Sequence, residues 1–122
     1  MNILKELVNG PFRDEQQFKT AVLKEWRKTK DNFSHFCIEN SVVYGMPDVL
    51  SMSSHQPSYF TEFKISDKRG VIKFRKTQPL FYKRHAHLNI AIYAWDRRNN
   101  WIVVIEPSTI IKNKSLLFKL PD

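Results

Sequence analysis

Cysteine and long apolar runs are nearly absent from this sequence. Cys37 is the single cysteine, so no disulfide can form within the chain, and a lone cysteine in an apolar run is typically a small buried residue. Residues 1–7 carry charges and lack the apolar core of a signal peptide. No stretch approaches the ~20 apolar residues that span a bilayer. These absences predict an intracellular protein, in the cytoplasm or nucleoid, without a membrane partner.

Acidic residues are scarce as well. The chain has 12 Asp and Glu against 20 Lys and Arg, which gives a formal net charge of +8 and a pI near 9.7. Such an excess of positive charge attracts polyanions through electrostatic steering and counterion release. The charge therefore favours a nucleic-acid partner, and the alternative is a soluble basic protein without one.

The sequence also lacks internal repeats, low-complexity segments and linkers. A length of 122 residues, with 42% apolar and 26% charged residues, is typical of one folded domain. We expect a single domain over residues 1–122, with residues 1–12 as an N-terminal extension and residues 112–122 as a C-terminal tail.

Hydrophobic periodicity predicts an α/β fold. Phe18, Val22 and Trp26 fall on one helical face, whereas residues 59–65 are rich in the aromatic and β-branched residues of strands. Helices are expected at residues 2–8, 14–27 and 77–87, with Thr77 as the N-cap of the last, and strands at residues 36–38, 48–52, 59–65, 90–95 and 101–105, with residues 42–44 extending or following the first. The last two strands are almost continuously apolar, which places them at the centre of the sheet.

Two segments hold the candidate catalytic residues. Strand side chains alternate, so Glu62 and Lys64 point one way and Phe63 points the other, while Asp48 stands at the start of the preceding strand. Two carboxylates can hold Mg²⁺, with a backbone carbonyl such as that of Phe63 as a further oxygen ligand, and a lysine can orient water or neutralise phosphate charge. This set of groups suits phosphodiester hydrolysis. A surface ion pair between Glu62 and Lys64 is the alternative.

These residues resemble the motif of the PD-(D/E)xK nuclease superfamily. Gly45-Met46-Pro47-Asp48 is followed, after thirteen residues, by Glu62-Phe63-Lys64. Gln78, in a basic segment that opens a helix, resembles the glutamine of the virus-type replication-repair nuclease (VRR-NUC) branch. Glu15, on the helix ahead of the motif, resembles the additional acidic residue of that branch and of archaeal Holliday junction resolvases. Compensation of the helix dipole is the alternative role for Glu15.

The resemblance implies a restriction-endonuclease-like core, with a mixed central sheet flanked by helices in α-β-β-β-α-β order and, here, an extra C-terminal strand. It implies that Asp48 and Glu62 bind Mg²⁺ or Mn²⁺, with Glu15 as a third acidic member. Lys64 would be the catalytic lysine, and Gln78 would support the site or contact the DNA backbone. No small-molecule cofactor is expected.

The segment that follows the Glu-x-Lys motif is strongly basic. Its only acidic residue is Asp67, and the candidate DNA-binding residues are Lys68, Arg69, Lys73, Arg75, Lys76, Lys83 and Arg84. Such a cluster would neutralise several phosphates. A solvated basic face is the alternative.

Together these features predict a metal-dependent DNA endonuclease, structure-selective on branched DNA like a Holliday junction resolvase, with a role in DNA repair and recombination. Such enzymes are commonly homodimers, because two strands must be cut symmetrically, and the apolar strands with Trp95 and Trp101 would supply the interface. The small size favours a virus or mobile element as the source. The alternatives are a non-catalytic DNA-binding module on the same scaffold and a general or restriction-like DNA nuclease.

Overall fold

The computed structural model describes residues 1–30, 32–38 and 44–122. The elements are β1 (Asn2–Leu4), α1 (Glu15–Thr29), β2 (Ser34–Cys37), β3 (Val49–Met52), β4 (Tyr59–Ile65), β5 (Val71–Lys73), α2 (Thr77–Arg84), β6 (Ile90–Asp96), β7 (Trp101–Ile105), α3 (Pro107–Lys112) and β8 (Leu117–Lys119). Residues 42 and 43 of the predicted strand continuation lie outside the described residues.

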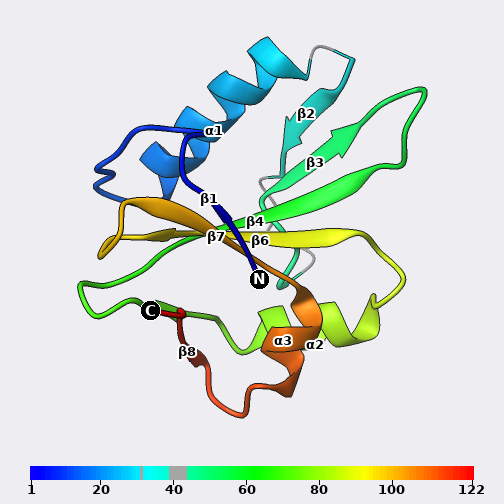
Figure 1. The fold of residues 1–122 in the computed structure, drawn as a ribbon. Coiled ribbons are helices and arrows are strands. Elements are labelled where there is room, and N and C mark those ends of the chain that lie inside the picture. The colour runs from blue at the N-terminus through cyan, green and yellow to red at the C-terminus, as the bar shows by residue number, and fades with distance from the viewer. Residues whose placement is uncertain (31, 39–43) are drawn as a thin grey trace.

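The centre of the molecule is a six-stranded sheet in the order β1-β7-β6-β4-β3-β2, and other elements pack on both of its faces (Figure 1). β4 and β6 pair in parallel, and the other neighbours pair antiparallel. Helix α1 covers one face, while α2, α3 and a small sheet of β5 and β8 cover the other (Figure 1). The expectation of a mixed sheet flanked by helices is confirmed.

Helix α1 begins at a side-chain cap. Asp14 precedes it in extended conformation, and its carboxylate accepts a hydrogen bond from the Gln17 backbone N–H at 2.8 Å, which satisfies one of the free donors at a helix start. Phe18, Val22 and Trp26 are buried on one face, as their spacing predicts. They form a core with Phe63 of β4, so α1 is held against the strand that carries the Glu-x-Lys motif.

Strand β6 lies at the centre of the sheet, as its apolar sequence predicts. Ile92 and Ala94 face the core beneath α2 and α3, and Trp95 faces the core beneath α1. Trp95 is only 1% exposed, and Trp101 is half-buried against the core on the α2 side. The expectation that Trp95 supplies a dimer interface is therefore wrong, because its ring is part of the core.

Both chain ends contain strands that local patterns do not reveal. Residues 2–8 were expected to be helical, yet Asn2–Leu4 pairs with β7. Part of the expected tail, Leu117–Lys119, pairs with β5. Strand formation at these two places depends on hydrogen bonds to distant segments, which the local sequence pattern does not contain.

Helix α2 differs from its prediction at both ends. Thr77 lies inside the helix, and the residue before it, Lys76, has helical backbone angles and makes no side-chain cap hydrogen bond. The helix ends at Arg84 instead of residue 87. Gln78, in the first turn, ties the segment before the helix to α2, because its side-chain oxygen accepts a hydrogen bond from the Arg75 N–H at 2.8 Å.

Strand β2 forms an edge of the sheet, which explains a further difference. Cys37 is exposed there, so the expectation of a buried cysteine is wrong. No helix among the described residues is long and apolar enough to cross a bilayer.

Candidate active site

Asp48 is fixed by its backbone and by its side chain. Its carbonyl accepts a hydrogen bond from Ile38 N–H at 2.7 Å, and its carboxylate Oδ2 accepts one from Phe63 N–H at 2.8 Å. Residue 63 lies beyond Thr61, where the pairing of β3 with β4 ends. The Asp48 side chain therefore occupies the place along β4 where the next ladder hydrogen bond would form.

The loop before Asp48 presses against the start of α2. Gly45 has a φ of +82°, which glycine adopts at little cost. A Cβ built on Gly45 would lie 2.2 Å from the carbonyl oxygen of Thr77. Glycine is thus required both for the backbone angle and for the close approach, which joins the Asp48 segment to the helix that carries Gln78.

Glu62 and Lys64 lie on the face of β4 that is opposite α1. The Lys64 Nζ lies 4.9 Å from the ring centroid of Phe74, which belongs to the core beneath α2, whereas Phe63 packs in the α1 core. Both charged residues are nearly buried, with 2% of Glu62 and 5% of Lys64 exposed. Glu62 and Lys64 therefore do not form a surface ion pair.

Gln78 joins Lys64 to α2. The Lys64 Nζ donates a hydrogen bond to Gln78 Oε1 at 2.9 Å, and the same oxygen accepts from Arg75 N–H. Gln78 is fully buried. Its amide nitrogen Nε2 is buried and has no hydrogen-bond partner among the described residues. The Gln78 amide therefore has free N–H donors in the interior of the protein.

Burial raises the pKa of Glu62 well above its ordinary value, and the negative charge of Asp48 raises it further. The positive charge of Lys64 opposes this shift. Glu62 Oε1 has no hydrogen-bond partner within the described part of the chain. A buried carboxylate with an unsatisfied oxygen beside a second carboxylate is a site where a cation would relieve unfavourable electrostatics.

Glu15, the first residue of α1, lies close enough to this group to interact with it. The residue as a whole is exposed, but desolvation of its carboxyl group raises its pKa. The charge of Asp48 also raises the pKa of Glu15, whereas the charge of Lys64 and the Ile65 backbone N–H lower it. The structure therefore brings all five predicted side chains, Glu15, Asp48, Glu62, Lys64 and Gln78, into one neighbourhood.

Tyr82 is a member of this neighbourhood that sequence reasoning missed. Burial raises the pKa of its phenol, and the charges of Glu62 and Asp48 raise it further. The hydroxyl has no hydrogen-bond partner among the described residues. Tyr82 follows Gln78 by four positions, so the two share a helix face, and that spacing is the signal that could have found it.

The donor set fits a hard divalent cation only in part. Within residues 1–30, 32–38 and 44–122, no three His, Cys, Asp or Glu side chains are placed so that they could hold a metal ion. Mg²⁺, however, is usually held by one or two carboxylates and keeps several waters. Asp48, the unsatisfied oxygen of Glu62 and the Phe63 carbonyl fit that pattern. The Phe63 N–H faces Asp48, and the carbonyl of a strand residue points to the same side as its N–H.

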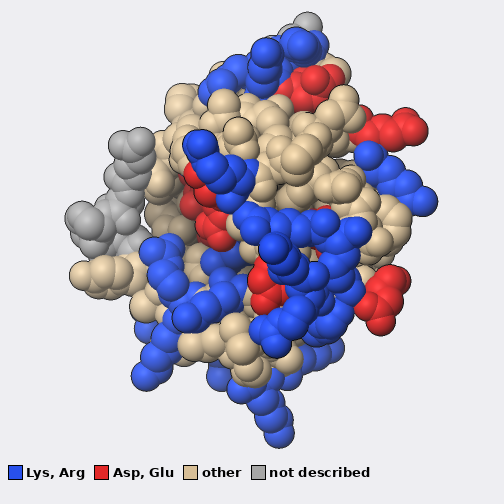
Figure 2. All heavy atoms as spheres, turned by 90° about the vertical axis from the view of Figure 1, so that its left-hand side faces the viewer, with Lys and Arg blue, Asp and Glu red and all other residues tan. Residues whose placement is uncertain are grey.

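The predicted DNA-binding residues, Lys68, Arg69, Lys73, Arg75, Lys76, Lys83 and Arg84, are all exposed. They lie in the turn after β4, in β5, before α2 and at the end of α2. Figure 2 shows the side on which the β6–β7 turn and the loop after β4 project: Lys and Arg crowd its lower half, with a few carboxylates among them.

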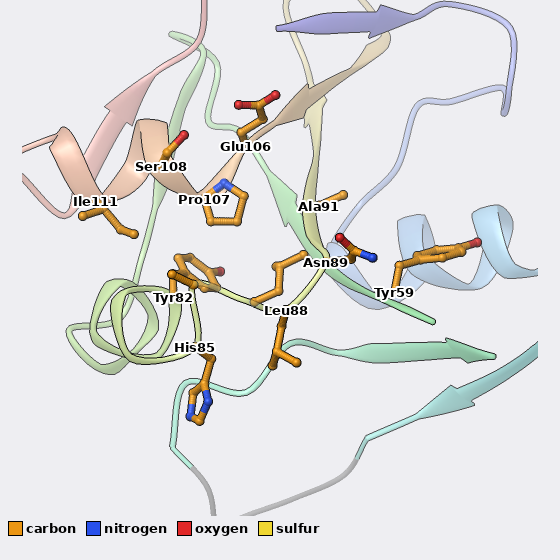
Figure 3. A pocket seen from close by; sticks show the side chains of 12 residues that line it. Tyr59, Tyr82, His85, Leu88, Asn89, Ala91, Glu106, Pro107, Ser108 and Ile111 are labelled. Atoms are coloured by element: carbon orange, nitrogen blue, oxygen red, sulfur yellow. The ribbon is translucent and has the colours of Figure 1, made fainter. Parts of the chain in front are cut away.

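A separate hollow of about 410 Å³ lies between α2, α3 and the start of β6. Tyr82, Leu88 and Pro107 line it, and in Figure 3 the Glu106 carboxylate and the His85 ring point away from these apolar side chains. Tyr82 is the one residue of the candidate site that lines this hollow, and neither Asp48 nor Glu62 does, so the hollow does not contain the candidate metal ligands.

No protein-family model matches the chain, and no curated protein matches it.

Proposed function

We propose that this protein is a metal-dependent endonuclease that hydrolyses DNA phosphodiester bonds on a restriction-endonuclease-like core of the PD-(D/E)xK type. The observation that carries the proposal is the hydrogen bond of 2.9 Å between Lys64 and Gln78, beside a buried Glu62 that has an unsatisfied oxygen. Burial of two charged residues costs free energy unless they are paired or functional. The order α1-β2-β3-β4-α2-β6, with β5 inserted before α2, supports the same core.

In this proposal each residue has a separate role. Asp48, Glu62 and the Phe63 carbonyl would hold Mg²⁺ or Mn²⁺, with Glu15 at the edge of the site. When bound, such an ion lowers the pKa of a bound water and stabilises negative charge on phosphate. Lys64 would orient the attacking water or neutralise the phosphate, because Gln78 fixes its ammonium group. Glu62 must be ionised to bind a cation, whereas its burial beside Asp48 raises its pKa and so favours the protonated form when no cation is bound.

The exposed basic residues would hold the DNA backbone, since contacts to phosphate position a duplex without reading its sequence. Activity on branched DNA, and a homodimer that cuts two strands symmetrically, are proposed on the resemblance to VRR-NUC nucleases and Holliday junction resolvases. The interface of such a dimer would have to exclude Trp95, which is buried.

Cleavage of a four-way junction, a linear duplex and supercoiled plasmid, with Mg²⁺ or Mn²⁺, tests the proposal. Wild type should cut, and the junction should be cut faster than the duplex. Asp48→Ala should be inactive, whereas Glu106→Gln, which changes an exposed carboxylate outside the site, should keep full activity. Binding without cleavage by wild type would instead indicate a non-catalytic DNA-binding module. Equal cleavage of junction and duplex would indicate a general nuclease.

A further inference from the structure

A second hollow, of about 410 Å³, lies among the loop before α1, the loop after β4 and the β6–β7 turn. Three cationic side chains, Arg13, Lys68 and Arg97, line it together with Asn100, and the apolar residues include Phe12 and Trp95. No Asp or Glu among the described residues lines it. The charged side chains that line the hollow are therefore all positive. Of these cations, Arg13 and Arg97 do not belong to the basic segment that the sequence singles out.

Arg97 is held in place without being neutralised. Its backbone N–H donates to Ser66 Oγ at 3.0 Å, and its Nη2 donates to the Arg13 carbonyl at 2.7 Å. This leaves most of the five guanidinium donors free. Among the described residues, Arg97 and Lys68 form no ion pair, and Arg13 forms only an exposed one with Asp14 at 3.5 Å.

The neighbouring Arg98 provides the contrast. Its guanidinium forms ion pairs with Asp96 at 2.8 Å and with Asp122 at 2.6 Å, and it also donates to the Pro121 carbonyl. Arg98 is therefore used to hold the fold together. Arg97, one residue earlier, presents its positive charge to the hollow and has no comparable structural role.

The hollow adjoins the candidate active site along the chain. Arg13 precedes Glu15 by two residues and Lys68 follows Lys64 by four, which corresponds to at most ~7 Å and ~14 Å of extended chain. Phosphates follow one another every ~3.4 Å along the axis of each DNA strand. A strand with one phosphate at Asp48 and Glu62 would thus have another within reach of the hollow a few nucleotides away.

We propose that Arg13, Lys68 and Arg97 form a phosphate-binding pocket for a backbone phosphate of the DNA strand, a few nucleotides from the phosphodiester that would be cut. The inference rests on the proposed function for its substrate, but it concerns binding and not hydrolysis. The same chemistry could serve free phosphate, so the two sources must be compared directly.

The test uses the full-length protein without divalent metal and measures DNA binding by fluorescence anisotropy across a range of salt concentrations. Arg13→Ala/Arg97→Ala should weaken binding about tenfold or more and lower the salt slope by about 1 to 2. Lys112→Ala/Lys114→Ala removes the same charge from exposed positions outside the pocket and should have a smaller effect. Equal effects of the two double variants would overturn the proposal.

Single methylphosphonate substitutions along the DNA locate the phosphate, because they remove its charge. One or two positions should weaken wild-type binding, and these positions should have no effect in Arg13→Ala/Arg97→Ala. If the same methylphosphonate positions still weaken binding by the variant, or if wild type does not bind DNA, the proposal of a phosphate-binding pocket is overturned. Inorganic phosphate that binds wild type as tightly as DNA does would also overturn it, since the pocket would then serve a free anion.

These outcomes are independent of catalysis. Suppose that the methylphosphonate effects disappear in Arg13→Ala/Arg97→Ala but wild type never cuts DNA. That result would contradict the nuclease proposal alone. If wild type cuts DNA but the same methylphosphonate positions weaken binding by wild type and by Arg13→Ala/Arg97→Ala, only the proposed phosphate-binding pocket would be contradicted.

Discussion

The ammonium group of Lys64 lies 2.9 Å from Gln78 Oε1, and both residues are buried. The glutamine oxygen also accepts a hydrogen bond from Arg75 N–H, so one side chain holds both the lysine and the segment that leads into α2. The geometry of the lysine is thereby coupled to the start of a helix fourteen residues away in sequence.

Gln78→Ala should therefore reduce cleavage about tenfold to a hundredfold, because Lys64 loses the group that orients it. It should also destabilise the fold by about 1–3 kcal/mol, since a buried ammonium and a backbone N–H lose their acceptor. Gln56→Ala, in an exposed loop, is the matched control and should change neither property. Cleavage kinetics and denaturant unfolding measure the two effects. Full activity in Gln78→Ala would show that Lys64 does not need this partner.

Glu62→Gln should abolish cleavage and raise the melting temperature by about 2–6 °C. Its carboxyl group is buried next to Asp48, and burial and that charge both raise its pKa. A neutral amide of the same shape removes this unfavourable interaction. Differential scanning fluorimetry without divalent metal, with the exposed Glu106→Gln as control, measures the shift. A lower melting temperature would mean that Glu62 stabilises the fold, contrary to a functional role for its burial.

Two glycines provide a matched pair of substitutions. Gly45 and Gly70 both have a φ of +82°, and an added Cβ would lie 2.2 Å from Thr77 O in one case and from Arg98 Nε in the other. Each change to alanine should cost about 1–2 kcal/mol from the backbone angle, with steric strain in addition. Gly45→Ala should also displace the Asp48 loop from α2. At a temperature where both variants are folded, we expect Gly45→Ala to lose more cleavage activity than Gly70→Ala does.

The strand that carries the Glu-x-Lys motif could be predicted from sequence, because its pattern is local. Residues 59–65 were expected as a strand, and β4 has these bounds. Alternation alone places Phe63 opposite Glu62 and Lys64, and the structure agrees: Phe63 packs against α1 and Lys64 reaches Gln78.

Other features depend on contacts that no local pattern encodes. Strand β1 exists because Asn2–Leu4 reaches β7 at the far end of the chain. The pocket of Arg13, Lys68 and Arg97 combines three loops, so its members are far apart in sequence and carry no shared motif.

Acid should weaken the fold partly through the Asp96 carboxylate. Burial alone would raise the pKa of Asp96, but hydrogen bonds and charge from Arg98 lower it below its ordinary value. A carboxylate with a lowered folded-state pKa stabilises the fold above its unfolded pKa, near 3.9, and this contribution is lost as the pH falls through the folded value. Asp96→Asn should thus melt below wild type at pH 7, and the difference should shrink below about pH 4. A difference that does not change between pH 7 and pH 3 would exclude this linkage.

Divalent cations should stabilise the protein even where no DNA is present. Mg²⁺ or Mn²⁺ at Asp48 and Glu62 would bind the folded state alone, which at a hundred times the dissociation constant corresponds to about 2.7 kcal/mol. Wild type should therefore melt at a higher temperature as MgCl₂ is added, relative to NaCl at equal ionic strength. Glu62→Gln and Asp48→Asn should lose this response, whereas Asp67→Asn, which changes a carboxylate paired with Arg69 outside the site, should keep it. A response of the same size in Glu62→Gln would place the cation elsewhere, and cleavage measurements on the same preparations would show whether hydrolysis follows the cation or not.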